Sequence, residues 1–194
     1  MNKSVNSVSR REREYLTMDE VEKLLITARS ATRQPERDYC ILLLMYRHGL
    51  RVSELCQLKL TDLNLESGEL YVNRLKGSER GVHPLHSGEI PALRSWLAVR
   101  ASLDLPLGVD TLFVSERRQS LSRFTINALI EVVAARAGLS HLDVHPHSLR
   151  HSCGYSLVNK GTDIRVIQSY LGHKSISSTT RYTQVNSRQY AKLF

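Results

Sequence analysis

The residues with the clearest chemical potential lie near the end of the chain, where a tyrosine follows a cluster of histidine and arginine. His147, Arg150 and His151 occupy positions i, i+3 and i+4, and His173 and then Tyr182 follow them. A phenol, imidazoles and a guanidinium can together break and rejoin a phosphodiester, with the tyrosine as the attacking nucleophile. The pattern predicts a site that handles phosphodiesters, in which Tyr182 could hold one DNA strand covalently.

The spacing of the first three residues favours anion binding. Side chains at i, i+3 and i+4 share one helix face, and Pro146 is typical of the first position of a helix. The backbone N–H groups of a helix N-terminus attract anions, and an arginine adds paired donors for phosphate oxygens. Taken alone, the same three residues are more often simply a solvated helix face.

Other residues of the same chemistry also have ordinary explanations when they are taken singly. Arg51 follows a turn at Gly49 and can be a side chain that reaches out to solvent. Lys76 lies in a glycine-containing turn, and His173 can complement the dipole at the end of a helix. The combination of these residues is more specific for phosphoryl transfer than any one of them. A tyrosine nucleophile must be activated, because its ordinary pKa is about 10. The reaction also needs cations around the phosphate and a proton donor for the leaving group.

Five short motifs, in order and in spacing, resemble the signature of the tyrosine recombinase (phage integrase) family. The resemblance extends from Thr17 to Gln184. The motifs are residues 49–55 (GLRVSEL), 76–77 (KG), 147–151 (HSLRH), 171–173 (LGH) and 178–182 (STTRY).

The resemblance implies a division of labour among six catalytic residues. Tyr182 attacks the scissile phosphate and forms a 3′-phosphotyrosyl ester, while Arg51 and Arg150 hold the non-bridging oxygens. Lys76 protonates the departing 5′-oxygen, His147 assists proton movement, and His173 forms a hydrogen bond with the phosphate.

The resemblance also implies two supporting residues and no cofactor. Glu54 would orient Arg51, and His151 would assist at the site. The ester conserves the energy of the broken bond, so that strand exchange needs neither ATP nor a metal ion.

The position of Arg51 distinguishes this chain within the family. Most members carry a separate N-terminal helical domain that closes around DNA, whereas only about 35 ordered residues are expected before Arg51. The shortness resembles the small recombinases that invert a promoter segment controlling bacterial fimbriae. It implies double-stranded DNA with inverted-repeat sites, a homotetramer at synapsis, and a DNA-bending protein as a helper. The alternatives are a catalytically silent DNA-binding regulator of the same fold and a type IB-like topoisomerase.

The charge of the chain fits a polyanionic partner. Net charge is +8, and residues 145–194 contain seven Lys/Arg against one acid, so that six of the eight charges lie there. Solubilising surface charge is the alternative explanation. From charge and position alone, the expected DNA contacts are Arg10, Arg11, Arg13, Arg80, Lys174 and Arg181.

The remaining composition predicts a cytoplasmic, nucleoid-associated protein. Cys40, Cys56 and Cys153 are odd in number and widely spaced, which indicates buried free thiols and no disulfide frame or zinc site. The polar start lacks the apolar run of a signal peptide, and the longest apolar stretch, residues 39–46, is too short to span a bilayer.

The elements that must position these residues predict a mainly α fold with a small antiparallel β-sheet (α+β). Residues 1–14 are expected to form a flexible basic arm, residues 15–184 a single catalytic domain and residues 185–194 a tail with apolar side chains. The family resemblance implies that this tail docks on a neighbouring protomer. Residues 60–85 alternate and contain glycines, which predicts two or three strands with a hairpin tip at 76–80. Helical periodicity and capping signals predict helices near residues 17–28, 36–48, 51–58, 90–102, 124–137, 147–159, 163–171 and 177–184.

Overall fold

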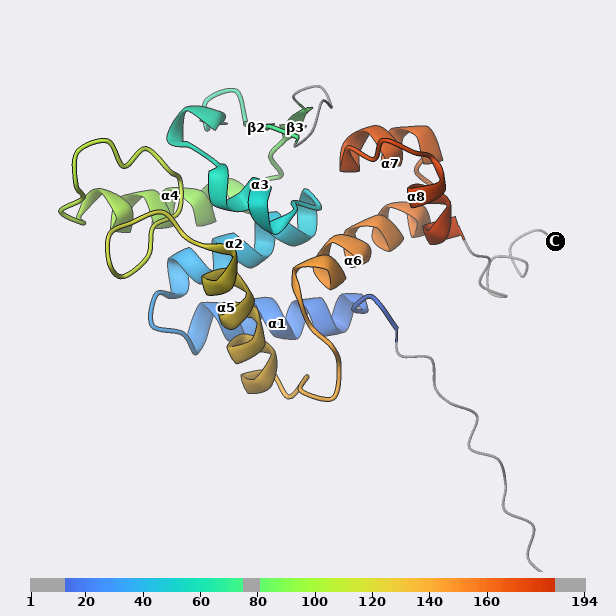
Figure 1. The fold of residues 1–194 in the computed structure, drawn as a ribbon, viewed down its shortest axis with the longest axis horizontal. Coiled ribbons are helices and arrows are strands. Elements are labelled where there is room, and N and C mark those ends of the chain that lie inside the picture. The colour runs from blue at the N-terminus through green and yellow to red at the C-terminus, as the bar shows by residue number, and fades with distance from the viewer. Residues whose placement is uncertain (1–12, 75–80, 184–194) are drawn as a thin grey trace, which may run out of the picture.

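The computed structural model describes residues 13–74 and 81–183 (Figure 1). These residues contain eight α-helices, two short 3-10 helices and a three-stranded sheet. The predicted α+β class is confirmed, and each predicted helix is present within a few residues of its expected bounds. The helices are α1 (Met18–Ser30), α2 (Pro35–Arg47), α3 (Val52–Gln57), α4 (Glu89–Ala101), α5 (Arg123–Arg136), α6 (Pro146–Asn159), α7 (Ile164–Leu171) and α8 (Ser177–Thr180), with 3-10 helices η1 (Leu60–Asp62) and η2 (Arg181–Thr183).

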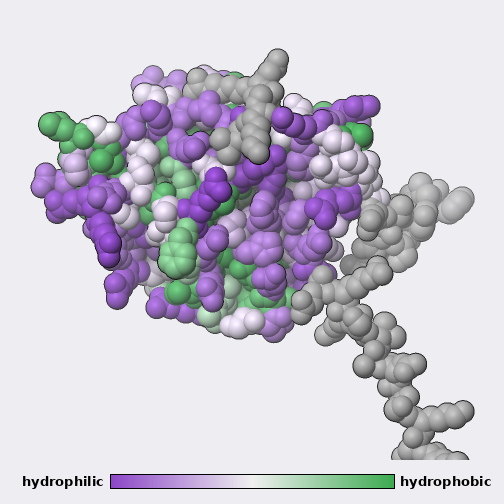
Figure 2. All heavy atoms as spheres, viewed as in Figure 1, coloured by the Kyte–Doolittle hydropathy of each residue, from purple (hydrophilic) through white to green (hydrophobic). Residues whose placement is uncertain are grey.

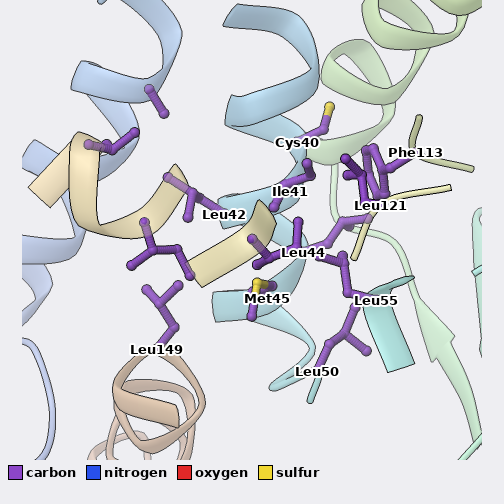
Figure 3. Close-up of a cluster of buried hydrophobic side chains, with 14 of the residues drawn as sticks. Cys40, Ile41, Leu42, Leu44, Met45, Leu50, Leu55, Phe113, Leu121 and Leu149 are labelled. Atoms are coloured by element: carbon purple, nitrogen blue, oxygen red, sulfur yellow. The ribbon is translucent and has the colours of Figure 1, made fainter. Parts of the chain in front are cut away.

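Helix α2 forms the centre of the hydrophobic core. Its residues 40–45 are all at most 2% exposed, as the continuous apolar run predicts. Figure 3 shows side chains of α2 beside Leu55 from α3, Phe113 from a loop and Leu149 from α6. Each buried leucine of this kind contributes about 1.5–3 kcal/mol, so α2 fixes the relative positions of the helices that carry the candidate site.

The sheet is antiparallel, with the strands in the order β1-β2-β3. Strands β1 (Leu63–Asn64), β2 (Glu69–Val72) and β3 (Gly81–Pro84) pair with Leu63 opposite Leu70 and Leu70 opposite His83. The alternation of β2 buries Leu70 and Val72, and the next residue of the same parity, Arg74, is also buried. The predicted hairpin tip lies outside the described residues.

Local capping fixes the start of α6 and both ends of α7. The His145 ring accepts a hydrogen bond from the N–H of His147 at 3.2 Å, and Pro146 occupies the first turn. Asp163 caps α7 by accepting from two backbone N–H groups. Gly172 ends α7 in the left-handed conformation, with φ +63°, which a side chain would strain.

A second, smaller core joins α6, α7 and η2. It consists of Cys153, Ile167, Leu171 and Tyr182, and Figure 1 shows α6 between the larger helical core and the α7–α8 end of the molecule. The predicted nucleophile is therefore part of a packed unit and does not project from the surface.

Two features of the fold differ from the sequence-based expectations. Cys56 is only half-buried, whereas Cys40 and Cys153 are buried free thiols as predicted; burial raises the pKa of each of these two to about 12. Residues 103–122, for which no element was predicted, supply the buried Leu112 and Phe113 through a loop with two isolated β-bridges. An irregular loop has no helical or strand periodicity, so the burial of its side chains cannot be predicted from the sequence pattern.

The face drawn in Figure 2 is mostly hydrophilic. Hydrophobic residues are scattered there among polar ones. No helix among the described residues is long and apolar enough to cross a membrane. The exposed large apolar side chains are Met18, Ile26, Val82, Leu107, Phe124, Val132 and Val166.

Candidate active site

An open pocket of about 570 Å³ gathers most of the residues that the sequence singled out. The predicted residues come from four places: the turn before α3, the first half of α6, the residue after Gly172, and η2. The pocket is lined by Glu14, Arg51, Asp143, His145, His147, Arg150, His151, His173, Ser178, Arg181 and Tyr182.

Tyr182 is held in this pocket with its ring buried and its hydroxyl engaged. The residue is 2% exposed, and its hydroxyl lies 3.0 Å from Nδ1 of His151. The ring of His173 is roughly parallel to it, with centroids 6.1 Å apart. Gly154 on α6 makes the close packing feasible, because a Cβ there would lie 2.6 Å from the tyrosine ring.

The surroundings of Tyr182 keep its hydroxyl protonated and place a neutral imidazole, that of His151, beside it. Burial raises the pKa of Tyr182, and the charges of Arg150 and Arg181 oppose that rise. Burial and Arg181 lower the pKa of His151 to about 4, so that its imidazole is neutral at pH 7. In the tautomer that carries its proton on Nε2, Nδ1 of the neutral ring accepts the hydrogen bond that the Tyr182 hydroxyl donates.

Arg150 is locked in place by backbone oxygens. Its Nη1 donates to the carbonyl of Gly49 and its Nη2 donates to that of Leu171 at 2.5 Å. Burial and the nearby Arg51 and Arg74 lower the pKa of Arg150 to about 10, which still leaves it charged at pH 7. Because the carbonyl acceptors are uncharged, they fix the guanidinium of Arg150 without neutralising it. Its positive charge can therefore act on an anion in the pocket.

Arg51 lies beside Arg150 and is held by a carboxylate. Its Nη1 donates to Glu54 at 2.6 Å, its backbone N–H donates to the other oxygen of Glu54 at 2.8 Å, and its Nη2 donates to the carbonyl of Gly172 at 3.0 Å. The side chain is 29% exposed, against 1% for that of Glu54. The structure therefore places Glu54 where it can orient Arg51.

The two remaining predicted histidines differ in environment. His147 is exposed at the start of α6, and desolvation, with nearby His145 and Arg150, lowers its pKa. His173 is half-buried, and its Nδ1 lies 2.9 Å from the hydroxyl of the buried Thr179. Burial and Arg150 lower the pKa of His173 to about 4. Both rings line the pocket in which a phosphate would sit.

The predicted DNA contacts are only partly described. Arg10, Arg11 and Arg80 lie outside the described residues, and so does Lys76, the predicted catalytic proton donor. Lys174 is exposed. Arg13 forms an ion pair with Glu20 in the first turn of α1, at 2.7 Å. Arg181 is exposed at the pocket rim, where it is paired with Glu14 at 3.0 Å.

Four residues in or next to the pocket were not singled out from the sequence. Glu14 and Asp143 line it and carry no recognisable spacing signal. Thr179 lies within the 178–182 motif, but its contact with His173 was not foreseen. Arg74 did carry a signal: it continues the buried face of β2 two residues after Val72, a place where an arginine is unexpected unless it has partners.

The fold and the site together define a tyrosine-based phosphodiester transesterification centre. A phenol with an acceptor on its oxygen lies beside two fixed arginines and two histidines in one open pocket. Among the described residues, no group of three or more His, Cys, Asp or Glu is arranged to hold a metal ion.

The chain belongs to the phage integrase family, whose model matches residues 14–189. The family resemblance predicted from the five motifs is confirmed. The chain is 40% identical over 185 residues to the type 1 fimbriae regulatory protein FimB of Escherichia coli K12, covering 95% of this chain and 91% of that protein. It is 42% identical over 183 residues to FimE of the same strain, covering 94% and 91%.

Solved recombinase structures have the same fold. The crystal structure of XerA recombinase matches with a TM-score of 0.81 at 35% identity, over 92% of this chain and 63% of that chain. XerH site-specific recombinase in a pre-cleavage complex with its difH substrate matches with a TM-score of 0.77 at 26% identity, over 94% and 53%. This chain thus spans about half to two thirds of those two chains.

Proposed function

We propose that this protein is a site-specific DNA recombinase that cleaves and rejoins duplex DNA through a 3′-phosphotyrosyl intermediate and inverts a promoter segment controlling fimbrial expression. The observation that carries the proposal is the pocket in which Tyr182, with its hydroxyl on His151, faces Arg51 and Arg150. The similarity to FimB and FimE, over nearly the whole of both chains, supports the fimbrial assignment.

In the cleavage step, the Tyr182 oxygen attacks phosphorus and the bond from phosphorus to the 5′-oxygen breaks. The phenolic proton passes to His151, whose Nδ1 lies 3.0 Å from the hydroxyl, and the ring of His147 lies further out, with the two imidazole centroids 6.5 Å apart. Lys76 gives a proton to the departing 5′-oxygen, which leaves as a neutral hydroxyl.

The two arginines stabilise the charge that develops on the phosphate. Arg150 is held by backbone carbonyls and Arg51 by Glu54, so neither guanidinium has to reorganise when the transition state forms. His173, which lines the same pocket, donates a hydrogen bond to a phosphate oxygen. Removing one such preorganised donor typically lowers the rate by about 100- to 1000-fold.

Rejoining is the reverse step with a different strand. The tyrosyl ester keeps the energy of the broken bond, and a 5′-hydroxyl from a partner strand reseals it. We propose two inverted-repeat sites, a homotetramer on DNA at synapsis in which residues 185–194 dock on a neighbouring protomer, and a DNA-bending protein as a helper. The reaction takes place on nucleoid DNA in the cytoplasm.

A nicked suicide substrate tests the cleavage chemistry. The short fragment released by cleavage diffuses away, so that the wild-type protein accumulates as a covalent protein–DNA adduct. Tyr182→Phe keeps the ring in its packed position and loses only the nucleophilic oxygen, and it should bind DNA and form no adduct. Binding by the wild type without any adduct would establish a silent DNA-binding regulator.

A plasmid with two inverted sites around a promoter tests the outcome. Inversion reported by a change in the orientation of the segment supports the recombinase. Relaxation of supercoils without exchange between the sites would establish a topoisomerase. Deletion of Tyr190 to Phe194 should leave binding to a single site detectable but abolish inversion, and unchanged inversion by this truncated chain would refute the proposed docking of the tail.

A further inference from the structure

Arg74 is a buried charge that the proposed mechanism does not use. It lies just beyond the end of β2 and is only 7% exposed. Its Nη1 donates to Glu54 at 2.7 Å, and its Nη2 donates to the carbonyl of Tyr170. An arginine is seldom buried to this extent unless several acceptors compensate the loss of its hydration.

Glu54 connects Arg74 to the candidate active site. One carboxylate oxygen accepts from Arg51 Nη1 at 2.6 Å, while the other accepts from Arg74 at 2.7 Å and from the backbone N–H of Arg51 at 2.8 Å. The carboxylate is 1% exposed. A single buried carboxylate is therefore shared by two guanidinium groups, of which only Arg51 faces the pocket.

The charge balance of this triad matters for phosphate binding. A buried Arg51–Glu54 pair alone would be neutral, and Glu54 would offset the charge that Arg51 offers to a phosphate. With Arg74 the three groups carry a net charge of +1, and one oxygen of Glu54 is held away from the Arg51 guanidinium. Because charges interact strongly in a poorly solvated site, this difference should be felt by an anion in the pocket.

A directed chain of hydrogen bonds holds Arg74 on its other side. Arginine can only donate, so Nε2 of His83, 3.2 Å from Arg74 Nη2, must accept, and the ring proton of His83 is then on Nδ1. That proton points to Nδ1 of His48 at 3.3 Å, which leaves the proton of His48 on Nε2, 2.9 Å from the carboxylate of Glu89. The chain ties Arg74 to β3 and to the start of α4.

Close packing leaves Arg74 little freedom. A Cβ at Gly172 would lie 2.8 Å from Cδ of Arg74, and the carbonyl of the same glycine accepts from Arg51. The two arginines therefore contact one loop, the loop that leads to His173.

We propose that Arg74 is a positioning residue, which holds Glu54 against Arg51 and keeps the triad positive, so that Arg51 can balance the charge on the non-bridging oxygens of the scissile phosphate. The inference rests on the proposed recombinase function. It assigns Arg74 no contact with DNA and no role toward the leaving group.

Chemically altered phosphates test this assignment. Single-turnover adduct formation is measured for the wild type, Arg74→Gln and Arg74→Lys on three nicked substrates. One has the natural phosphate, one has a neutral methylphosphonate in place of a charged non-bridging oxygen, and one has a sulfur in place of the bridging 5′-oxygen. The third substrate provides a leaving group that needs no proton. Arg33→Gln, an exposed arginine 3.7 Å from Glu116, is the matched control.

On the natural phosphate, Arg74→Gln should lower the cleavage rate about 100-fold, with DNA affinity within about threefold of the wild type. Arg74→Lys should lose about tenfold, because lysine keeps the charge but lacks the paired donors. On the methylphosphonate the Gln defect should shrink at least tenfold, and on the sulfur substrate it should remain. Arg33→Gln should match the wild type throughout.

Two results would overturn the proposal. Equal defects on all three substrates would mean that Arg74 is only structural, and recovery on the sulfur substrate alone would mean that it serves the leaving group. If Arg74→Gln does not fold, the Lys variant, which keeps the buried charge, is judged by the same ratios. Absence of an adduct with the wild type on the natural phosphate would instead refute the proposed function.

Discussion

The substitution Gly154→Ala perturbs the position of the nucleophile without touching any polar group of the site. A Cβ on Gly154 would lie 2.6, 2.7 and 2.8 Å from three carbons of the Tyr182 ring. Ordinary contact between carbon atoms begins at about 3.4 Å. The ring must therefore retreat by about 0.6–0.8 Å (3.4 − 2.8 and 3.4 − 2.6) if α6 keeps its place.

The two free-energy effects on folding are of similar size and opposite sign. Replacing glycine by alanine inside a helix stabilises it by about 1 kcal/mol, while forcing a methyl group into a packed site costs about 1–3 kcal/mol. The variant should lose about 0–2 kcal/mol of the free energy of unfolding. Catalysis is more sensitive, since a misplacement of about 1 Å can cost about 100-fold, so adduct formation should fall roughly 10- to 100-fold.

Adduct formation on the nicked substrate, DNA binding by fluorescence anisotropy and thermal unfolding together test this reasoning. Gly88→Ala is the matched control, because a Cβ there would meet Arg47 only at 3.6 Å, and it should leave all three measurements unchanged. Cleavage by Gly154→Ala at the wild-type rate, with normal folding, would refute the claim that the ring position seen here is the one that reacts.

Three further predictions concern pH, salt and the pocket rim. The pKa values of His83, His151 and His173 are lowered to about 3, 4 and 4, mainly by burial; the unfolded chain then binds more protons between pH 6.5 and 4, so the free energy of unfolding should fall as pH drops through that window. Urea unfolding at pH 7 and pH 5 measures this, and equal midpoints would contradict it. DNA affinity should fall with salt with a log–log slope of about −0.9 per phosphate contact, and Arg181→Gln should reduce that slope by about one unit; an unchanged slope would exclude Arg181 as a phosphate contact. Glu14→Gln removes the exposed partner of Arg181 and should tighten DNA binding by roughly two- to threefold in anisotropy titrations, with little change in stability, whereas weaker binding would mean that Glu14 orients Arg181 for DNA.

Local signals in the sequence were sufficient for most of the fold. The capping box of Thr17 and Glu20, the apolar run of α2 and the helix-ending glycine at 172 depend only on near neighbours in the sequence, and the structure contains all three. The loop that buries Leu112 and Phe113 could not be found in this way, because its burial depends on partners far along the chain.

What the sequence determined by itself was the inventory of the site: the types of residue, their order and the family to which the order belongs. Arg51 and Tyr182 are 131 positions apart (182 − 51), and no local rule says how they face one another. Tertiary structure alone decided that Tyr182 is buried, that its hydroxyl meets His151, and that Glu54 is shared with Arg74. These are properties of packing between α6, η2 and the end of β2, and packing is settled only when distant segments exclude water from the same volume.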